Sequence, residues 1–265
     1  DPDLDEIERL VQQDTSIKGI WCVPKYSNPT GTTYSETAVK RFSMLPKISG
    51  DNFRIMWDNA YAVHHLSDAP DQLANLMALA RHHDTNDSMV LFGSTSKVTF
   101  AGAGISFLGT SQEKLGEFEQ HLSETMIGFD KVNQLRHVLF LKDMSGIARH
   151  MARHAALLKP RFALTEKILS KYLDGKRIGE WSRPNGGYFV SFDAIPGQAK
   201  EIITLAANVG VRLTPAGATF PYGIDPQDRN IRLAPTFPAL DSLQQALEVF
   251  VVCVQLASVR HYLKS

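Results

Sequence analysis

The sequence predicts an α/β fold, in which a mostly parallel sheet is followed by a smaller α+β part. Short apolar segments alternate with helical segments up to about residue 130, which is typical of a parallel sheet with helices on both faces. After that point long helical segments come first and two further strands later. The 265 residues are 43% hydrophobic and 21% charged, an ordinary globular composition that is sufficient for one large or two smaller domains.

In the first half, strands and helices follow one another in turn. We expect strands at 17–24, 53–58, 88–94 and 104–110, and helices at 3–13, 35–45 and 70–83. Ser35 stands directly before the second helix and is a suitable N-cap.

The second half begins with helices at 111–126 and 131–142. One long helix is expected over 145–173, bent or interrupted at Pro160. Strands follow at 186–193 and 230–235, with a helix at 200–210 that Gly210 ends and a closing helix at 241–263. We therefore place one domain at 1–140 and a second at 141–265.

Charge and cysteine content limit the possible partners. Lys plus Arg and Asp plus Glu both number 28, so the chain has no electrostatic footprint for nucleic acid or an anionic membrane. No apolar run approaches twenty residues, so we expect no membrane span and no signal peptide. Cys22 and Cys253 lie in apolar runs and are expected as buried thiols, which suits the cytoplasm. The chain lacks an initiator Met and opens in a helix, so we expect it to be the C-terminal portion of a longer protein.

Polar residues follow three of the predicted strands. In open parallel sheets, ligands bind beyond the carboxyl ends of the strands, so neighbouring strands would bring these residues to one crevice. They are Asn28 after the first strand, Asp58 and Tyr61 after the second, and Ser94, Ser96 and Lys97 after the third.

This set suits a particular chemistry. A lysine can form a Schiff base with an aldehyde, and a carboxylate can keep a pyridine nitrogen protonated. Asn and Tyr can hydrogen-bond a phenolic oxygen, and hydroxyls with backbone N–H groups can cradle a phosphate. Together these are the requirements of pyridoxal phosphate.

Each residue also has a purely structural interpretation. Asn28 could form only a turn, Asp58 could cap a helix, and Lys97 could be a solvated surface lysine. Tyr61 could pack in the core, and the two serines could satisfy the loop backbone. A ligand-binding site is favoured because these residues follow three successive strands, each group after its own strand.

Two further signals lie in the second half. Arg232 interrupts the apolar strand NIRLAP and needs an anionic partner, either a ligand carboxylate or an internal acidic residue. His150 and His154 have a spacing that can bind a metal, but the helix lacks the glutamate of a protease motif. We expect a solvated helix face there and no metal site.

The motifs NPTG, WDNAY, STSK and IRLAPTFP resemble those of fold-type I pyridoxal-phosphate enzymes of the aminotransferase kind. STSKVTFAGAGISF, DKVNQLRH, PNGGYFVSFD and LTPAGATFPYG are similar to the aspartate aminotransferase group called Ic. The resemblance covers nearly the whole chain. It implies that 1–140 is the C-terminal part of the cofactor-binding large domain, that 141–265 is the small C-terminal domain, and that the protein is a homodimer.

The resemblance also implies roles for the residues around the cofactor ring. Lys97 would carry the cofactor and move the substrate proton. Asp58 would pair with the pyridine nitrogen, and Tyr61 and Asn28 would bond the ring oxygen.

The remaining implied roles concern the phosphate and the substrate. Ser94 and Ser96 would hold the phosphate, and Arg232, together with Asn28, would contact the substrate. Many aminotransferases have an arginine eight residues after the lysine that reaches the phosphate. Here that position is Ile105, so another group is expected to hold the phosphate.

The implied activity is transamination between an amino acid, such as aspartate or another dicarboxylic one, and a 2-oxo acid such as 2-oxoglutarate. Lyase or decarboxylase chemistry uses the same constellation. An aminotransferase-like domain of a transcriptional regulator and a non-catalytic scaffold are the alternatives from other classes.

Overall fold

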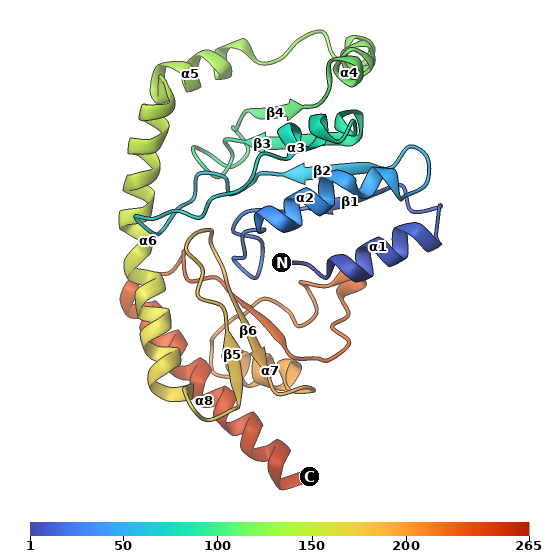
Figure 1. The fold of residues 1–265 in the computed structure, drawn as a ribbon. Coiled ribbons are helices and arrows are strands. Elements are labelled where there is room, and N and C mark those ends of the chain that lie inside the picture. Colours follow the sequence, from blue (N-terminus) through green and yellow to red (C-terminus); the bar gives the residue numbers. More distant parts are fainter. Residues whose placement is uncertain (265) are drawn as a thin grey trace. The chain divides into compact units, whose positions relative to one another are not determined.

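A computed structural model describes residues 1–264, which divide into two compact units (Figure 1). The first unit comprises residues 1–27, 32–63 and 71–151. The second comprises 28–31, 64–70 and the residues from 152 onward. The expected domains at 1–140 and 141–265 stay a prediction.

The first unit is built on a four-stranded sheet of order β1-β2-β3-β4 (Figure 1). β1 (Gly19–Cys22), β2 (Arg54–Asp58) and β3 (Met89–Ser94) are parallel, and β4 (Ser106–Gly109) runs antiparallel to β3. β4 reverses direction because the segment between it and β3 is too short for a crossover helix. The prediction of a mostly parallel sheet is confirmed.

Three helices build the core of this unit: α1 (Leu4–Gln13), α2 (Glu36–Met44) and α3 (Leu76–His82). Their apolar side chains pack with Ile55, Trp57 and Met89, which share one face of the sheet. On the other face, Trp21 is 59% exposed and stacks on Phe92 at 5.3 Å between ring centroids. These three helices therefore cover the face that carries Ile55, Trp57 and Met89.

Helix caps explain where α2 and α3 begin. The Ser35 hydroxyl accepts a hydrogen bond from the Ala38 N–H at 3.1 Å, as predicted. The Asn75 side chain accepts from the Ala78 N–H at 3.0 Å, so α3 begins several residues later than the sequence predicts. Short 3₁₀ turns follow these helices at Leu45–Lys47 and Asn86–Ser88.

Two more helices, α4 (Gln112–Thr125) and α5 (Lys131–Leu141), complete the first unit. α6 (Met144–Leu173) begins in the first unit and continues in the second. The prediction of one long helix is confirmed, whereas the interruption considered at Pro160 is not found, because the helix continues through this residue.

The second unit contains an antiparallel sheet of β5 (Gly179–Trp181), β6 (Val190–Ala194) and β7 (Asn230–Leu233). The three-residue β5 is too short to predict from a pattern. α7 (Ala199–Asn208) ends before Gly210, whose positive φ of 91° fits the predicted termination. A 3₁₀ turn lies at Pro221–Gly223.

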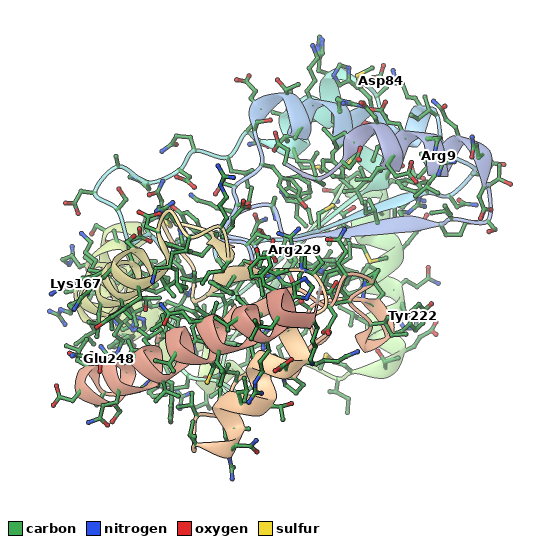
Figure 2. The ribbon with its side chains drawn as sticks, turned by 90° about the horizontal axis from the view of Figure 1, so that it is seen from below. Arg9, Asp84, Lys167, Tyr222, Arg229 and Glu248 are labelled. Atoms are coloured by element: carbon green, nitrogen blue, oxygen red, sulfur yellow. The ribbon has the colours of Figure 1, made fainter. Side chains whose placement is uncertain are left out.

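The C-terminal helix α8 (Leu240–Lys264) is long and apolar enough to cross a membrane by length and composition, contrary to the expectation that no segment would be. Its apolar character has a structural cause. Leu247, Phe250 and Val254 are buried in the core of the second unit, where Phe250 meets Phe192 edge-on. Glu248 lies on the outward side of the helix (Figure 2), and the buried side of α8 forms part of the core of the second unit.

Candidate functional site

The segment 95–105, here called the lysine loop, joins β3 to β4 and carries Lys97. The Lys97 Nζ lies 5.2 Å from the centroid of the Tyr61 ring, within the range of a cation–π contact. Tyr61 itself is buried. The structure therefore brings the predicted lysine and tyrosine together.

The ends of β2 and β3 place two further predicted residues at one edge of the sheet. Asp58 is the last residue of β2 and pairs in register with Phe92 of β3. The Asn59 N–H donates to the Phe92 carbonyl at 2.9 Å and extends this pairing. Ser94 lies two residues beyond Phe92, so Asp58 and Ser94 both belong to the carboxyl edge where ligands bind in such sheets.

Ser94 and Ser96 form a hydroxyl pair. The Ser94 hydroxyl donates to the Ser96 Oγ at 2.8 Å and accepts from the Ser96 N–H at 3.0 Å. Gly104 runs directly beside this pair: a Cβ at this position would lie 2.3 Å from the Ser96 Oγ and 2.6 Å from its backbone nitrogen. The small residues of the loop thus let two chain segments approach each other closely around the hydroxyls.

Ile105 is tied into the backbone of the loop. Its N–H donates to the Thr95 hydroxyl at 2.8 Å, and its carbonyl accepts from the Thr95 N–H at 2.9 Å. This position therefore supplies no cation. The hydroxyl pair and the backbone N–H groups beside it are the groups that the sequence predicts to hold a phosphate.

In the second unit, Arg232 and Asn28 lie together. Arg232 donates to the Asn28 Oδ1 at 3.2 Å and to the Thr214 hydroxyl at 3.5 Å, and its guanidinium lies 4.6 Å from the Phe189 ring centroid. Its Nε is buried and has no hydrogen-bond partner within residues 1–264. No ion pair of these described residues involves Arg232, so the internal acidic partner is not found there.

A turn before β7 holds this strand in place. The Asp225 carboxylate accepts from the backbone N–H groups of Gln227, Arg229 and Asn230 at 2.8–2.9 Å. Burial raises the pKa of Asp225, but these backbone hydrogen bonds outweigh it and lower the pKa below the usual carboxyl value. The turn therefore depends on the ionised carboxylate and leads into β7 two residues before Arg232.

The groups present fit pyridoxal phosphate in their chemistry. The first unit offers an amine, a carboxylate, a phenol and two hydroxyls at one edge of its sheet. The second unit offers a guanidinium with an unpaired, buried donor, and such a group indicates a missing anionic partner.

Sequence reasoning missed several residues around the loop. His150, predicted on a solvated helix face, is half-buried instead. Its Nε2 lies 2.8 Å from the Val98 carbonyl, and its ring meets Phe140 edge-on. The prediction was wrong because the start of α6 packs against the lysine loop. Within residues 1–264 no group of three or more metal-ligating side chains occurs.

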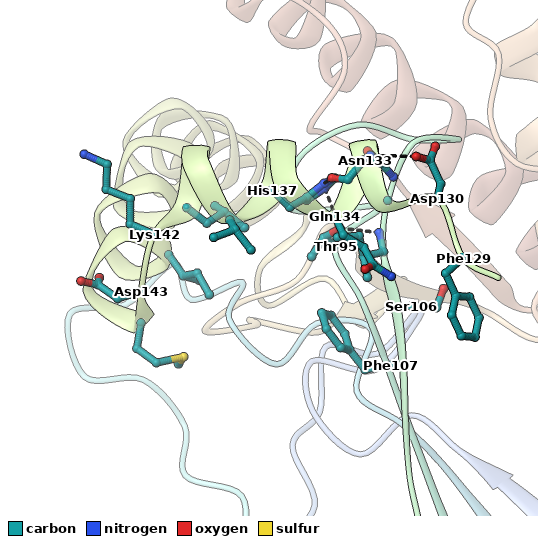
Figure 3. Close-up of a pocket in the computed structure, with 16 residues that line it drawn as sticks. Thr95, Ser106, Phe107, Phe129, Asp130, Asn133, Gln134, His137, Lys142 and Asp143 are labelled. Carbon is teal, nitrogen blue, oxygen red and sulfur yellow. Dashed lines mark hydrogen bonds between the residues drawn. The ribbon is translucent and has the colours of Figure 1, made fainter. Parts of the chain in front are cut away.

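A cavity of about 930 Å³ lies beside the lysine loop, between β4 and α5 (Figure 3). Thr95, Phe107 and His137 are among its lining residues, whereas none of the predicted cofactor residues lines it. The cavity therefore adjoins the back of the loop and is not the predicted cofactor site.

A parallel sheet with a lysine, a carboxylate and hydroxyls beyond its strand ends, joined to an α+β unit, defines the class of fold-type I aminotransferases. The sequence model of the aspartate aminotransferase family matches residues 1–265. The chain belongs to this family, which confirms the resemblance.

Relatives and solved structures agree with this assignment. The aspartate aminotransferase of Corynebacterium glutamicum is 41% identical over 261 residues, covering 98% of this chain and 60% of that protein. A provisionally named aminotransferase of Mycolicibacterium smegmatis is 48% identical over 257 residues, covering 97% of this chain and 60% of that protein. The crystal structure of an aspartate transaminase from C. glutamicum matches with a TM-score of 0.95 at 40% identity, covering 98% of this chain and 61% of that one. The chain thus spans about 60% of the length of these relatives.

Proposed function

We propose that the complete protein is a pyridoxal-phosphate-dependent transaminase. It moves an amino group between aspartate, or another dicarboxylic amino acid, and a 2-oxo acid such as 2-oxoglutarate. The observation that carries the proposal is the Lys97 amine, 5.2 Å from the Tyr61 ring centroid, in the loop that follows the strand beside Asp58. The name of the relative from C. glutamicum supports aspartate as the substrate.

The residues of the first unit have separate roles in cofactor binding and proton transfer. The cofactor, when bound, supplies an electron sink for the substrate. Lys97, in its neutral form, takes the proton from the substrate α-carbon on Nζ. The Asp58 carboxylate keeps the ring nitrogen protonated, the Tyr61 hydroxyl bonds the ring oxygen, and the hydroxyls of Ser94 and Ser96 hold the phosphate.

In the second unit, Arg232 binds the substrate α-carboxylate. A planar guanidinium holds a carboxylate through two parallel hydrogen bonds, and the unpaired Nε of Arg232 is available as one of the donors. Asn28, which accepts from the same guanidinium, orients it and bonds the ring oxygen.

The test uses the complete protein loaded with pyridoxal phosphate. Transamination predicts that aspartate converts the visible absorbance band to that of the pyridoxamine form and that 2-oxoglutarate restores it. A band that ignores amino acids would contradict the proposal. It would favour a regulatory role, in line with a Bacillus subtilis helix-turn-helix-type transcriptional regulator, itself uncharacterised, that is 24% identical over 96% of this chain. Release of the substrate side chain or of carbon dioxide would indicate lyase or decarboxylase chemistry instead.

The proposal includes a cytoplasmic homodimer. It is supported by the family resemblance and by the two buried, unpaired cysteines. Light scattering of the loaded protein measures its mass, and a monomer would contradict the dimer.

A further inference from the structure

Helix α5 holds the lysine loop through contacts outside the predicted site. The Asn133 side-chain amide donates to the Ala103 carbonyl at 3.1 Å. The Arg136 guanidinium lies 5.8 Å from the centroid of the Phe100 ring. His137, one turn after Asn133, is only 6% exposed and faces the same loop.

The hydrogen-bond partners of His137 fix which ring nitrogen carries the proton. Its Nδ1 lies 2.9 Å from the Asn133 carbonyl, which can only accept, so Nδ1 is the donor. Its Nε2 lies 3.1 Å from the Thr95 hydroxyl and 2.9 Å from the Thr99 hydroxyl (Figure 3 shows the Thr95 contact). Since Nδ1 carries the proton, Nε2 of the neutral ring can only accept, so the Thr95 hydroxyl, which itself accepts from the Ile105 N–H, donates to the imidazole.

These two threonines stand two residues before and two residues after Lys97. The backbone N–H groups of Val98 and Thr99 both donate to the Thr95 carbonyl at 2.8 Å, which closes one tight turn around Lys97. One imidazole thus contacts both ends of the turn whose centre carries the lysine.

We infer that His137 is a positioning residue for Lys97. Its Nε2 contacts the hydroxyls of Thr95 and Thr99, and the Thr99 hydroxyl also donates to the Thr95 carbonyl at 3.2 Å. These contacts fix the turn and thereby the direction of the amine. The inference rests on the proposed function for its catalytic consequence, whereas its effect on the lysine loop is independent of it. Preorganised geometry matters because a misplacement of about 1 Å can cost on the order of 10²-fold in rate.

A purely structural role would give a different result. A histidine that only fills space in the core would affect the stability of the protein, with the affinity and spectrum of the bound cofactor unchanged. The experiment must therefore measure a property of Lys97 or of its loop, and not only the stability of the protein.

The central variant is His137→Phe, which keeps a buried ring and removes the contacts of Nε2 with both hydroxyls. In the complete protein we expect the dissociation constant of pyridoxal phosphate to rise and the pH midpoint of the visible band to shift. We expect kcat to fall by about tenfold or more, with a smaller change in KM. Without cofactor, hydrogen exchange of the peptide over 93–104 should accelerate.

His137→Gln is the rescue variant, because its amide oxygen can reach the same hydroxyls. It should recover most of the midpoint and of kcat. His121→Gln is the matched control, since His121 is exposed on α4, and it should behave as the wild type in every measurement. Thr99→Val removes one hydroxyl from the network and repeats the test should His137→Phe not fold.

The inference is overturned when a folded His137→Phe or Thr99→Val protein keeps the wild-type loop exchange, band midpoint and kcat. It is also overturned when His137→Gln is as impaired as His137→Phe. A wild-type protein that forms no band rejects the proposed function instead, and the loop exchange still decides the role of His137.

Discussion

Lys97 is the side chain on which the proposed chemistry depends, because it is the only amine of the candidate residues. We expect Lys97→Ala to lower kcat for transamination by about 10²–10⁴-fold, since no other basic group of the set can move the proton. Stopped-flow absorbance with aspartate measures the step directly. Lys167→Ala, an exposed change on α6 (Figure 2), is the matched control. Substantial turnover by Lys97→Ala would remove this lysine from the mechanism.

Gly104 must lack a side chain because Ser96 lies directly beside it. Because a Cβ there would lie 2.3–2.8 Å from the Ser96 Oγ, N and Cα, Gly104→Ala must displace the serine backbone. We expect a loss of about 1–3 kcal/mol of unfolding free energy and weaker cofactor binding. Denaturant titration and fluorescence titration with pyridoxal phosphate measure the two effects. Gly116→Ala on α4, where a Cβ meets nothing within 4 Å, should cause neither.

The turn before β7 is expected to contribute to stability in a pH-dependent way. The pKa of Asp225 is lower in the folded protein than in the unfolded chain. The Asp225 carboxylate therefore stabilises the fold fully above the pKa of an unfolded carboxyl, and this stabilisation is lost as pH falls through the lower pKa of the folded state. Asp225→Asn should therefore cost about 1 kcal/mol near neutral pH and little in strong acid. Thermal unfolding across pH tests this, with the exposed Glu248→Gln as control. Equal destabilisation of Asp225→Asn at every pH would contradict it.

Among the helices and strands, the sequence patterns predicted the presence of an element better than its first and last residues. The alternation of apolar segments was sufficient for β1, β2 and β3, and the hydroxyl of Ser35 for the start of α2. The patterns did not show that Asn75 would cap α3, since the residues before it also fit a helix. They did not predict β5 either, because three residues carry no periodicity.

For the whole molecule, the sequence pointed to candidate site residues more readily than to the residues that support them. Asp58, Tyr61, Ser94 and Lys97 follow strands in an order that points to a ligand. His137 and His150 lie on helices, where a histidine is equally common on a solvated face. Only the packing of α5 and α6 on the lysine loop distinguishes them, and that packing depends on contacts distant in sequence.

Each unit carries one cysteine in its core, so the two thiols report on the integrity of the two units. Burial raises the pKa of Cys22 to about 12 and also raises that of Cys253, so little reactive thiolate forms in the folded state. We expect both thiols to react with a maleimide only as their units unfold in urea. Mass spectrometry of the labelled peptides measures each separately, and rapid labelling without denaturant would contradict the prediction.

Trp57 is buried immediately before Asp58 in β2, and consecutive Cα atoms lie about 3.8 Å apart. An indole so close to the proposed ring-binding carboxylate is a built-in donor for energy transfer to a bound chromophore. Its emission would therefore be quenched on loading and would change with the chemical state of the bound ring. Trp57 would thus report on occupancy of the proposed site, and Trp57→Phe would identify which part of the signal comes from it.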